Sequence, residues 1–222
     1  MSGNDTVTDP AKVQASEMLV GQVVGFEIED NAPQGRWRDG LFDFWKHCCT
    51  PVCFKTWFCP AVLLAQVMSR VGLDALGEHT TPANAKKTFC RIISILAGVW
   101  VLEKMMYAAF PLKQICSNEY PQCSYVFQDD FLNYIMNFLE FASGLYVLYI
   151  IIRTRSAIRK KSGIPPACCD IGNGAVDDCC TSFWCSCCVV GQMARHTADY
   201  NLVPDSCCTY NGLKTPENAV VV

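Results

Sequence analysis

Residues 131–152 read FLNYIMNFLEFASGLYVLYIII, an apolar stretch of 22 residues that contains one charged side chain, Glu140. A helix needs about 20 such residues to cross the hydrocarbon core of a bilayer. Residues 89–112 form a second apolar stretch, FCRIISILAGVWVLEKMMYAAFPL, which Glu103 and Lys104 interrupt. We therefore expect an all-α membrane protein built on a two-helix transmembrane hairpin.

Basic residues gather at one end of both predicted helices. The segment between the helices, residues 113–130, contains Lys113 as its only cation, whereas the other ends carry Lys86, Lys87, Arg91, Arg153, Arg155, Arg159, Lys160 and Lys161. Because basic residues favour the cytoplasmic side of a membrane, we expect both termini in the cytoplasm and residues 113–130 as an external loop. Cys116 and Cys123 in that loop either form one disulfide or remain two free thiols.

The composition narrows the possible functions. The chain has 222 residues, a formal net charge of −3 and 16 cysteines, and nothing in that balance predicts the basic surface of a nucleic-acid-binding protein. Residues 1–35 are polar, without the apolar core of a signal peptide, and we expect a flexible leader. Most cysteines are then expected in a reducing compartment, as metal thiolates, acylation sites or buried thiols. Without a phosphate-binding loop, a dinucleotide fingerprint or a Ser-His-Asp set, we expect no enzyme.

Two cysteine-rich segments, predicted as modules over residues 36–72 and 165–200, share a pattern. The first contains CFKTWFCPAVLLAQV, in which Cys53 and Cys59 are followed by Gln66, and the second contains CCTSFWCSCCVVGQM, in which Cys179 and Cys185 are followed by Gln192. The spacing between the cysteines and the glutamine is the same in both segments. We therefore expect two copies of one small unit that flank the hairpin, with residues 201–222 as a C-terminal tail.

The two cysteine-rich blocks, the QVMSRVG continuation of the first, and DDCCTSFWCSCCVVGQMARH in the second resemble the PLAC8 family. The resemblance covers roughly residues 37–200. It implies a protein of the plasma membrane or an endomembrane, often oligomeric, linked to divalent-cation efflux, to calcium influx or to control of cell number.

The repeat offers a symmetric set of thiols for a metal ion. Zinc favours four soft or borderline ligands in a tetrahedral arrangement, and Cys53, Cys59, Cys179 and Cys185 supply four such ligands. The five residues between the cysteines of each pair are more than the usual two to four. Packing as buried thiols and S-acylation beside the bilayer remain alternatives to zinc.

Polar residues also recur inside the predicted spans. Asn133, Asn137 and Glu140 lie on one helix face, and Glu103 is expected at a depth similar to that of Glu140 in the antiparallel hairpin. A carboxylate in the membrane is costly and must face a partner helix, another subunit or water. These four residues are either an ion pathway or structural groups, with Lys104 pairing with Glu140 and the asparagines joining helices.

The favoured function is transport of divalent cations such as zinc, cadmium or calcium, or regulation of that transport. Two helices cannot enclose a pore, so we expect a homo-oligomer in contact with membrane lipid. The alternative is a membrane scaffold or signalling regulator that does not transport, with structural zinc or acylated cysteines.

Overall fold

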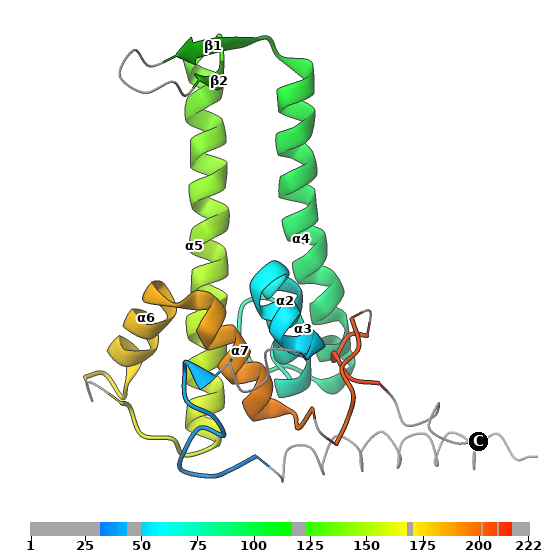
Figure 1. Cartoon of the computed structure of the whole chain (residues 1–222), viewed down its shortest axis with the longest axis vertical. Coiled ribbons are helices and arrows are strands. Elements are labelled where there is room, and N and C mark those ends of the chain that lie inside the picture. Colours follow the sequence, from blue (N-terminus) through cyan, green and yellow to red (C-terminus); the bar gives the residue numbers. More distant parts are fainter. Residues whose placement is uncertain are drawn as a thin grey trace, which may run out of the picture.

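The computed structural model describes residues 32–43, 50–116, 123–167, 171–200, 202–207 and 209–214, so most of the predicted leader lies outside the described residues. Two long helices, α4 (Pro82–Ala109) and α5 (Asp130–Lys161), stand side by side and are joined at one end by a short β-hairpin (Figure 1). Around their other ends lie four shorter helices, α2 (Pro51–Phe58), α3 (Pro60–Val71), α6 (Ala175–Trp184) and α7 (Ser186–Thr197). We call this helical end of the molecule the base.

Both long helices are long and apolar enough to cross a membrane, as the sequence predicted. Each extends beyond its apolar stretch on the side of the base. Helix α4 begins at Pro82, where proline is well tolerated. Helix α5 begins after Asp129, whose side chain accepts a hydrogen bond from the Phe131 amide, and it continues to Lys161. The chain therefore forms one helical hairpin whose inner ends belong to the base.

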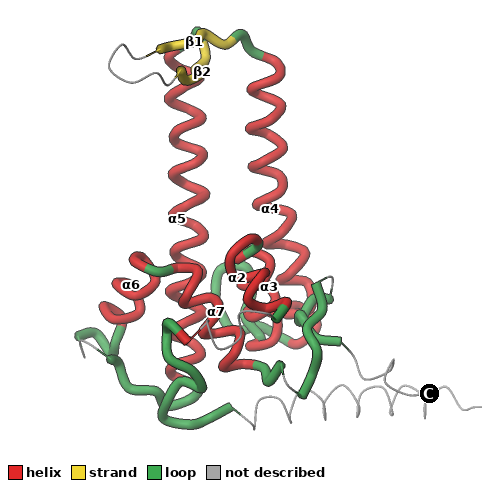
Figure 2. The backbone as a smooth tube through the Cα atoms, in the orientation of Figure 1, coloured by secondary structure: helices red, strands yellow, loops and turns green. Residues whose placement is uncertain are grey.

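The segment between the long helices is not the plain loop that the sequence suggested. Strands β1 (Leu112–Cys116) and β2 (Cys123–Phe127) pair antiparallel, from Leu112 opposite Phe127 to Cys116 opposite Cys123 (Figure 2). The rest of the described structure is mostly helical. The expectation of an all-α protein therefore missed this two-stranded sheet.

The core of the molecule lies in the base. Helices α3 and α7 bury much of their apolar surface, including Leu63, Leu64, Val189 and Val190, all at most 1% exposed. Ile92 of α4 and further apolar residues of α5 complete the same cluster. Burial of these side chains gives the base its main stabilisation.

The two helix pairs of the base turn in the same way. Cys59 separates α2 from α3 with φ −139° and ψ 53°, and Cys185 separates α6 from α7 with φ −144° and ψ 58°. Helices α3 and α7 have 12 residues each. Where α2 meets α7, a Cβ on Gly191 would lie 2.9 Å from Thr56 Cγ2, so the close approach requires glycine.

Terminal segments bind to the glutamine of each pair. The Gln66 amide donates to the carbonyls of Ser206, Cys207 and Thr209 in the C-terminal segment. The Gln192 amide donates to the carbonyl of Asp39 in the N-terminal segment. Part of the predicted tail is thus an integral piece of the base.

Candidate functional sites

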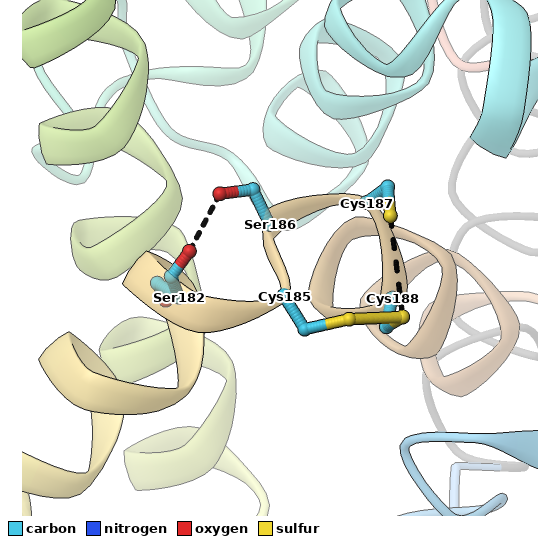
Figure 3. Close-up of a disulfide and its surroundings, with 5 residues drawn as sticks. All are labelled: Ser182, Cys185, Ser186, Cys187 and Cys188. Atoms are coloured by element: carbon cyan, nitrogen blue, oxygen red, sulfur yellow. Dashed lines mark hydrogen bonds between the residues drawn. A yellow bond between two sulfur atoms is a disulfide. The ribbon is translucent and has the colours of Figure 1, made fainter.

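Three cysteine side chains lie close together at the junction between α6 and α7, and we call them the thiol cluster. Cys185 is the N-cap of α7, and Cys187 and Cys188 lie in the first turn of that helix. Their sulfur atoms all lie within 4.8 Å of one another. Figure 3 shows Cys185 Sγ bonded to Cys188 Sγ. The Cys187 Sγ lies 4.0 Å from the Cys188 Sγ. The Ser186 hydroxyl donates to the Ser182 carbonyl at 2.6 Å and joins the two helices beside the cluster (Figure 3).

The chemistry of this thiol cluster suits a soft metal ion or a thiol–disulfide couple. Cys185 and Cys188 have the spacing C-x₂-C, which is usual in zinc sites and in redox-active pairs. The start of a helix stabilises negative charge and so favours thiolates. With the thiols reduced, the three sulfurs fit three of the four positions of a tetrahedral zinc site, and a fourth ligand would come from water or another group.

The four cysteines predicted as a symmetric zinc site do not gather. In the portions of the chain that the structure describes, the group of potential ligands within 4.8 Å contains only Cys185 of the predicted four. Cys53 is buried at the inner side of α2, whereas Cys59 and Cys179 are exposed. The helix geometry explains this. The two cysteines of each pair are six residues apart, and a helix ends at the second one, so their side chains point in different directions.

The sequence contained the signal for the cluster that the structure displays. That signal is the two-residue gap between Cys185 and Cys188, whereas the five-residue gap that the two segments share led to the prediction of the symmetric set. Cys187 and Cys188 have no cysteine counterparts in the first segment, where Ala61 and Val62 stand. The cluster is therefore a feature of the second segment alone.

His196 is held in the base and does not belong to the thiol cluster. Its ring is 1% exposed. Nδ1 lies 3.3 Å from the Arg38 amide, which donates to it, and Nε2 lies 3.0 Å from the Ser162 hydroxyl. Burial, with Arg38 adding to it, lowers the pKa of His196 from 6.5 to about 4. Both ring nitrogens are engaged, so the neutral ring is a structural group.

The polar residues of the spanning helices have different surroundings. Asn137 and Glu140 are exposed on α5, and Glu103 is partly exposed on α4. Among the described residues, neither glutamate forms an ion pair, and Lys104 lies instead 5.8 Å from the ring centres of Trp100 and Tyr107.

Asn133 has a local partner that explains it. Its side-chain oxygen accepts from the Phe127 amide and its nitrogen donates to the Phe127 carbonyl, both at 2.9 Å. It therefore fastens the end of β2 to the first turn of α5. The structure therefore does not place Asn133 with Glu103 and Glu140 along one predicted ion pathway.

Cys116 and Cys123 lie opposite each other in the β-hairpin and are joined by a disulfide. The bond closes a segment at the far end of the molecule from the base (Figure 1).

The model of the PLAC8 family matches residues 37–196 of this chain. That range runs from the N-terminal segment packed on α7 through both helix pairs and the hairpin between them. No curated protein and no solved structure matches the chain.

Proposed function

The chain belongs to the PLAC8 family, and we propose that it mediates or regulates the passage of divalent cations across a membrane as a homo-oligomer. In this proposal it is not an enzyme. The protein lies in the plasma membrane or an endomembrane, with both termini in the cytoplasm. The residues that act on the ion are Glu140, Glu103 and Asn137.

The observation that carries the proposal is the exposed carboxylate of Glu140. It lies in the apolar part of α5, and within the described chain it has no cationic partner. An uncompensated carboxylate in lipid costs a few kcal/mol. The cost is avoided if Glu140 faces water or a cation, and Asn137, one turn away, offers an amide oxygen on the same side.

The surfaces of the long helices support an oligomer. From Ala97 to Ala109, α4 has no residue in the buried set, and large apolar side chains such as Trp100, Met105, Phe138 and Phe141 are 59% to 64% exposed. Lipid can cover such surfaces, but it cannot satisfy Glu140. Further copies of the hairpin would bring several Glu140 carboxylates round a common axis.

The test is cation flux through proteoliposomes loaded with a metal-sensitive dye. We expect Zn²⁺, Cd²⁺ or Ca²⁺ to enter vesicles that contain the wild-type protein, and Glu140→Gln to abolish that flux. Size-exclusion chromatography should give the same assembly for both proteins. The matched control is Glu78→Gln, which removes an equal charge from an exposed ion pair with Arg153 in the base and should leave flux unchanged.

Two results would overturn the transport proposal. One is wild-type flux no greater than that of protein-free vesicles. The other is full flux in Glu140→Gln and in the double variant that also carries Glu103→Gln.

The thiol cluster has a supporting role in this account. Cys185, Cys187 and Cys188 would hold a soft divalent ion, zinc first, on the cytoplasmic side of the pathway. The equal turns at Cys59 and Cys185 support two copies of one unit, of which the second alone has acquired the cluster.

The rival function is a membrane scaffold or growth regulator that does not transport. One observation favours it: Cys179 and Cys180 are exposed neighbours on α6, as acylation beside a bilayer requires. In that case the metal at the thiol cluster would be structural, and Glu140 would only join subunits.

A further inference from the structure

Helices α2 and α6 keep their charged side chains inward. On α2 the exposed residues are Pro51, Phe54, Trp57 and Phe58, whereas Lys55 and Thr56 are 4% and 3% exposed and lie inward together with Val52 and Cys53. On α6 the exposed residues are Ala175, Val176, Cys179, Cys180, Phe183 and Trp184, whereas Asp177, Asp178 and Ser182 are at most 5% exposed. A surface helix of a water-soluble domain has the opposite arrangement.

Two of the inward charges, Lys55 and Asp178, have ion-pair partners in the base. Lys55 pairs with Asp205, and Asp178 pairs with both Arg155 and Arg159 of α5. The outer faces contain no charge at all, and their aromatic side chains are 54% to 83% exposed. Each helix is therefore fixed by its polar side to the base and presents an apolar side outward.

The parts of α4 and α5 that stand clear of the base are, by themselves, too short to cross a bilayer. Packing of the core cluster on α4 reaches Leu96, and on α5 it begins at Tyr146. The free parts, residues 97–109 and 130–145, are about 20 Å and about 24 Å long at the rise of an α-helix. The hydrocarbon core is about 30 Å thick, so the top of the base must lie about 6–10 Å inside it.

The basic residues of the long helices also indicate that the cytoplasmic boundary of the hydrocarbon core lies below the top of the base. About twenty residues counted from the outer ends of α4 and α5 reach the neighbourhood of Arg91 and Arg153. Ile92, Leu96 and Tyr146, on which the base packs, lie on the membrane side of these two cations. The junction of α6 and α7 lies at the upper edge of the base, beside the middle of α5 (Figure 1).

We propose that the outer faces of α2 and α6 lie in the inner leaflet of the bilayer, so that the lipid-contacting surface of the hairpin continues onto the base. The partner is the lipid boundary between headgroups and acyl chains, where tryptophan is preferred. Helix α3 does not itself cross the membrane, because Leu63 to Ser69 are at most 6% exposed and belong to the protein core. Because the chain bends by 115° between α2 and α3, α2 can lie in the leaflet while α3 packs in the base. This inference does not depend on transport.

The test uses tryptophan fluorescence in lipid nanodiscs with brominated phospholipids. The chain has five tryptophans, Trp37, Trp45, Trp57, Trp100 and Trp184, and four are changed to Phe so that one remains. Single Trp57 and single Trp184 should lose most of their emission to bromines placed high on the acyl chains and little to aqueous acrylamide. Single Trp100, on the free part of α4, is the positive control. Single Trp37, which lies against Arg155 and His196 in the base, is the negative control.

Quenching of Trp57 and Trp184 by acrylamide, with bromolipid quenching no greater than that of Trp37, would overturn the proposal by showing faces open to water. Quenching by neither agent would overturn it as well, because another protein copy would then cover the faces. If Trp37→Phe loosens the base, the measurement is repeated with Trp37 retained and its signal subtracted, using the variant in which Trp37 is the sole tryptophan.

Discussion

Lys55 and Asp205 are 150 residues apart in the chain, and Lys55 Nζ lies 2.5 Å from Asp205 Oδ1. The two side chains are 5% and 4% exposed. Lys55 also donates to Gln66 Oε1 at 2.9 Å. This ion pair therefore holds the C-terminal segment against helices α2 and α3. It also neutralises Lys55, the charged residue on the inward side of α2.

Asp205→Ala should destabilise the base strongly. It would leave the Lys55 ammonium buried without its counter-ion, a change that costs about 3–5 kcal/mol. The thermal unfolding midpoint of protein in detergent measures the loss. Asp130→Ala, which breaks the pair of Lys113 with an aspartate whose side chain is 93% exposed, should cost no more than about 1 kcal/mol. Equal midpoints for the two variants would contradict this assignment.

The sequence predicted the two spanning helices because a stretch of about 20 apolar residues is typical of a membrane-spanning helix. It did not predict that α5 continues to Lys161, since Arg155 and Arg159 resemble flanking charges until Asp178 is seen between them. It also gave no sign of β1 and β2, each of which is paired with the other. Both features depend on contacts with another segment of the chain.

The candidate site was predicted less well than the fold. Sequence symmetry drew attention to Cys53, Cys59, Cys179 and Cys185, yet a metal needs sulfur atoms in one place rather than equal spacing. Cys187 and Cys188 lie beside Cys185 because α7 begins there. The C-x₂-C spacing is present in the sequence, but the helix break that brings the three sulfur atoms together was not predicted.

His196 should make the base less stable as the pH falls from 6.5 towards 4. The pKa of this histidine is lowered to about 4 in the fold by burial, with Arg38 adding to the effect. Above pH 6.5 the ring is neutral in the folded and unfolded chain alike. Below it, the unfolded chain binds a proton that the folded chain does not, so the free energy of unfolding declines.

The measurement compares thermal midpoints at pH 7 and pH 5 for the wild type and His196→Gln. The variant should show a smaller decline between the two values, whatever its midpoint at pH 7. His79→Gln, in which an exposed histidine is changed, should retain the wild-type decline. A wild-type slope in His196→Gln would show that other groups cause the acid sensitivity.

Protein purified under reducing conditions should contain about one zinc per chain, held by the thiol cluster. Changing Cys185, Cys187 and Cys188 together to Ser should remove the metal, as measured by mass spectrometry of the elements. The matched control changes Cys53, Cys59 and Cys179 to Ser and should keep it. Loss of zinc from the control alone would favour the symmetric site, and absence of zinc from the wild type would rule out a resident zinc at either place.

The disulfide of the β-hairpin should report on which side of the membrane that end lies. If the base faces the cytoplasm, Cys116 and Cys123 face an oxidising space, where a disulfide persists. In intact cells, a membrane-impermeant alkylating reagent should modify these two thiols only after an impermeant reductant has been added, as peptide mass spectrometry can show.

Cys207 is the internal control for that experiment, because it is an exposed free thiol of the base. It should be modified only after the membrane has been permeabilised. If Cys207 were modified in intact cells, and Cys116 and Cys123 only after permeabilisation, the orientation would be the opposite of the predicted one. The basic residues near Arg91 and Arg153 would then lie outside, against the rule that governs short flanking segments. Because the helix pairs flank the hairpin on one side, a single labelled thiol in the base suffices to orient the whole molecule.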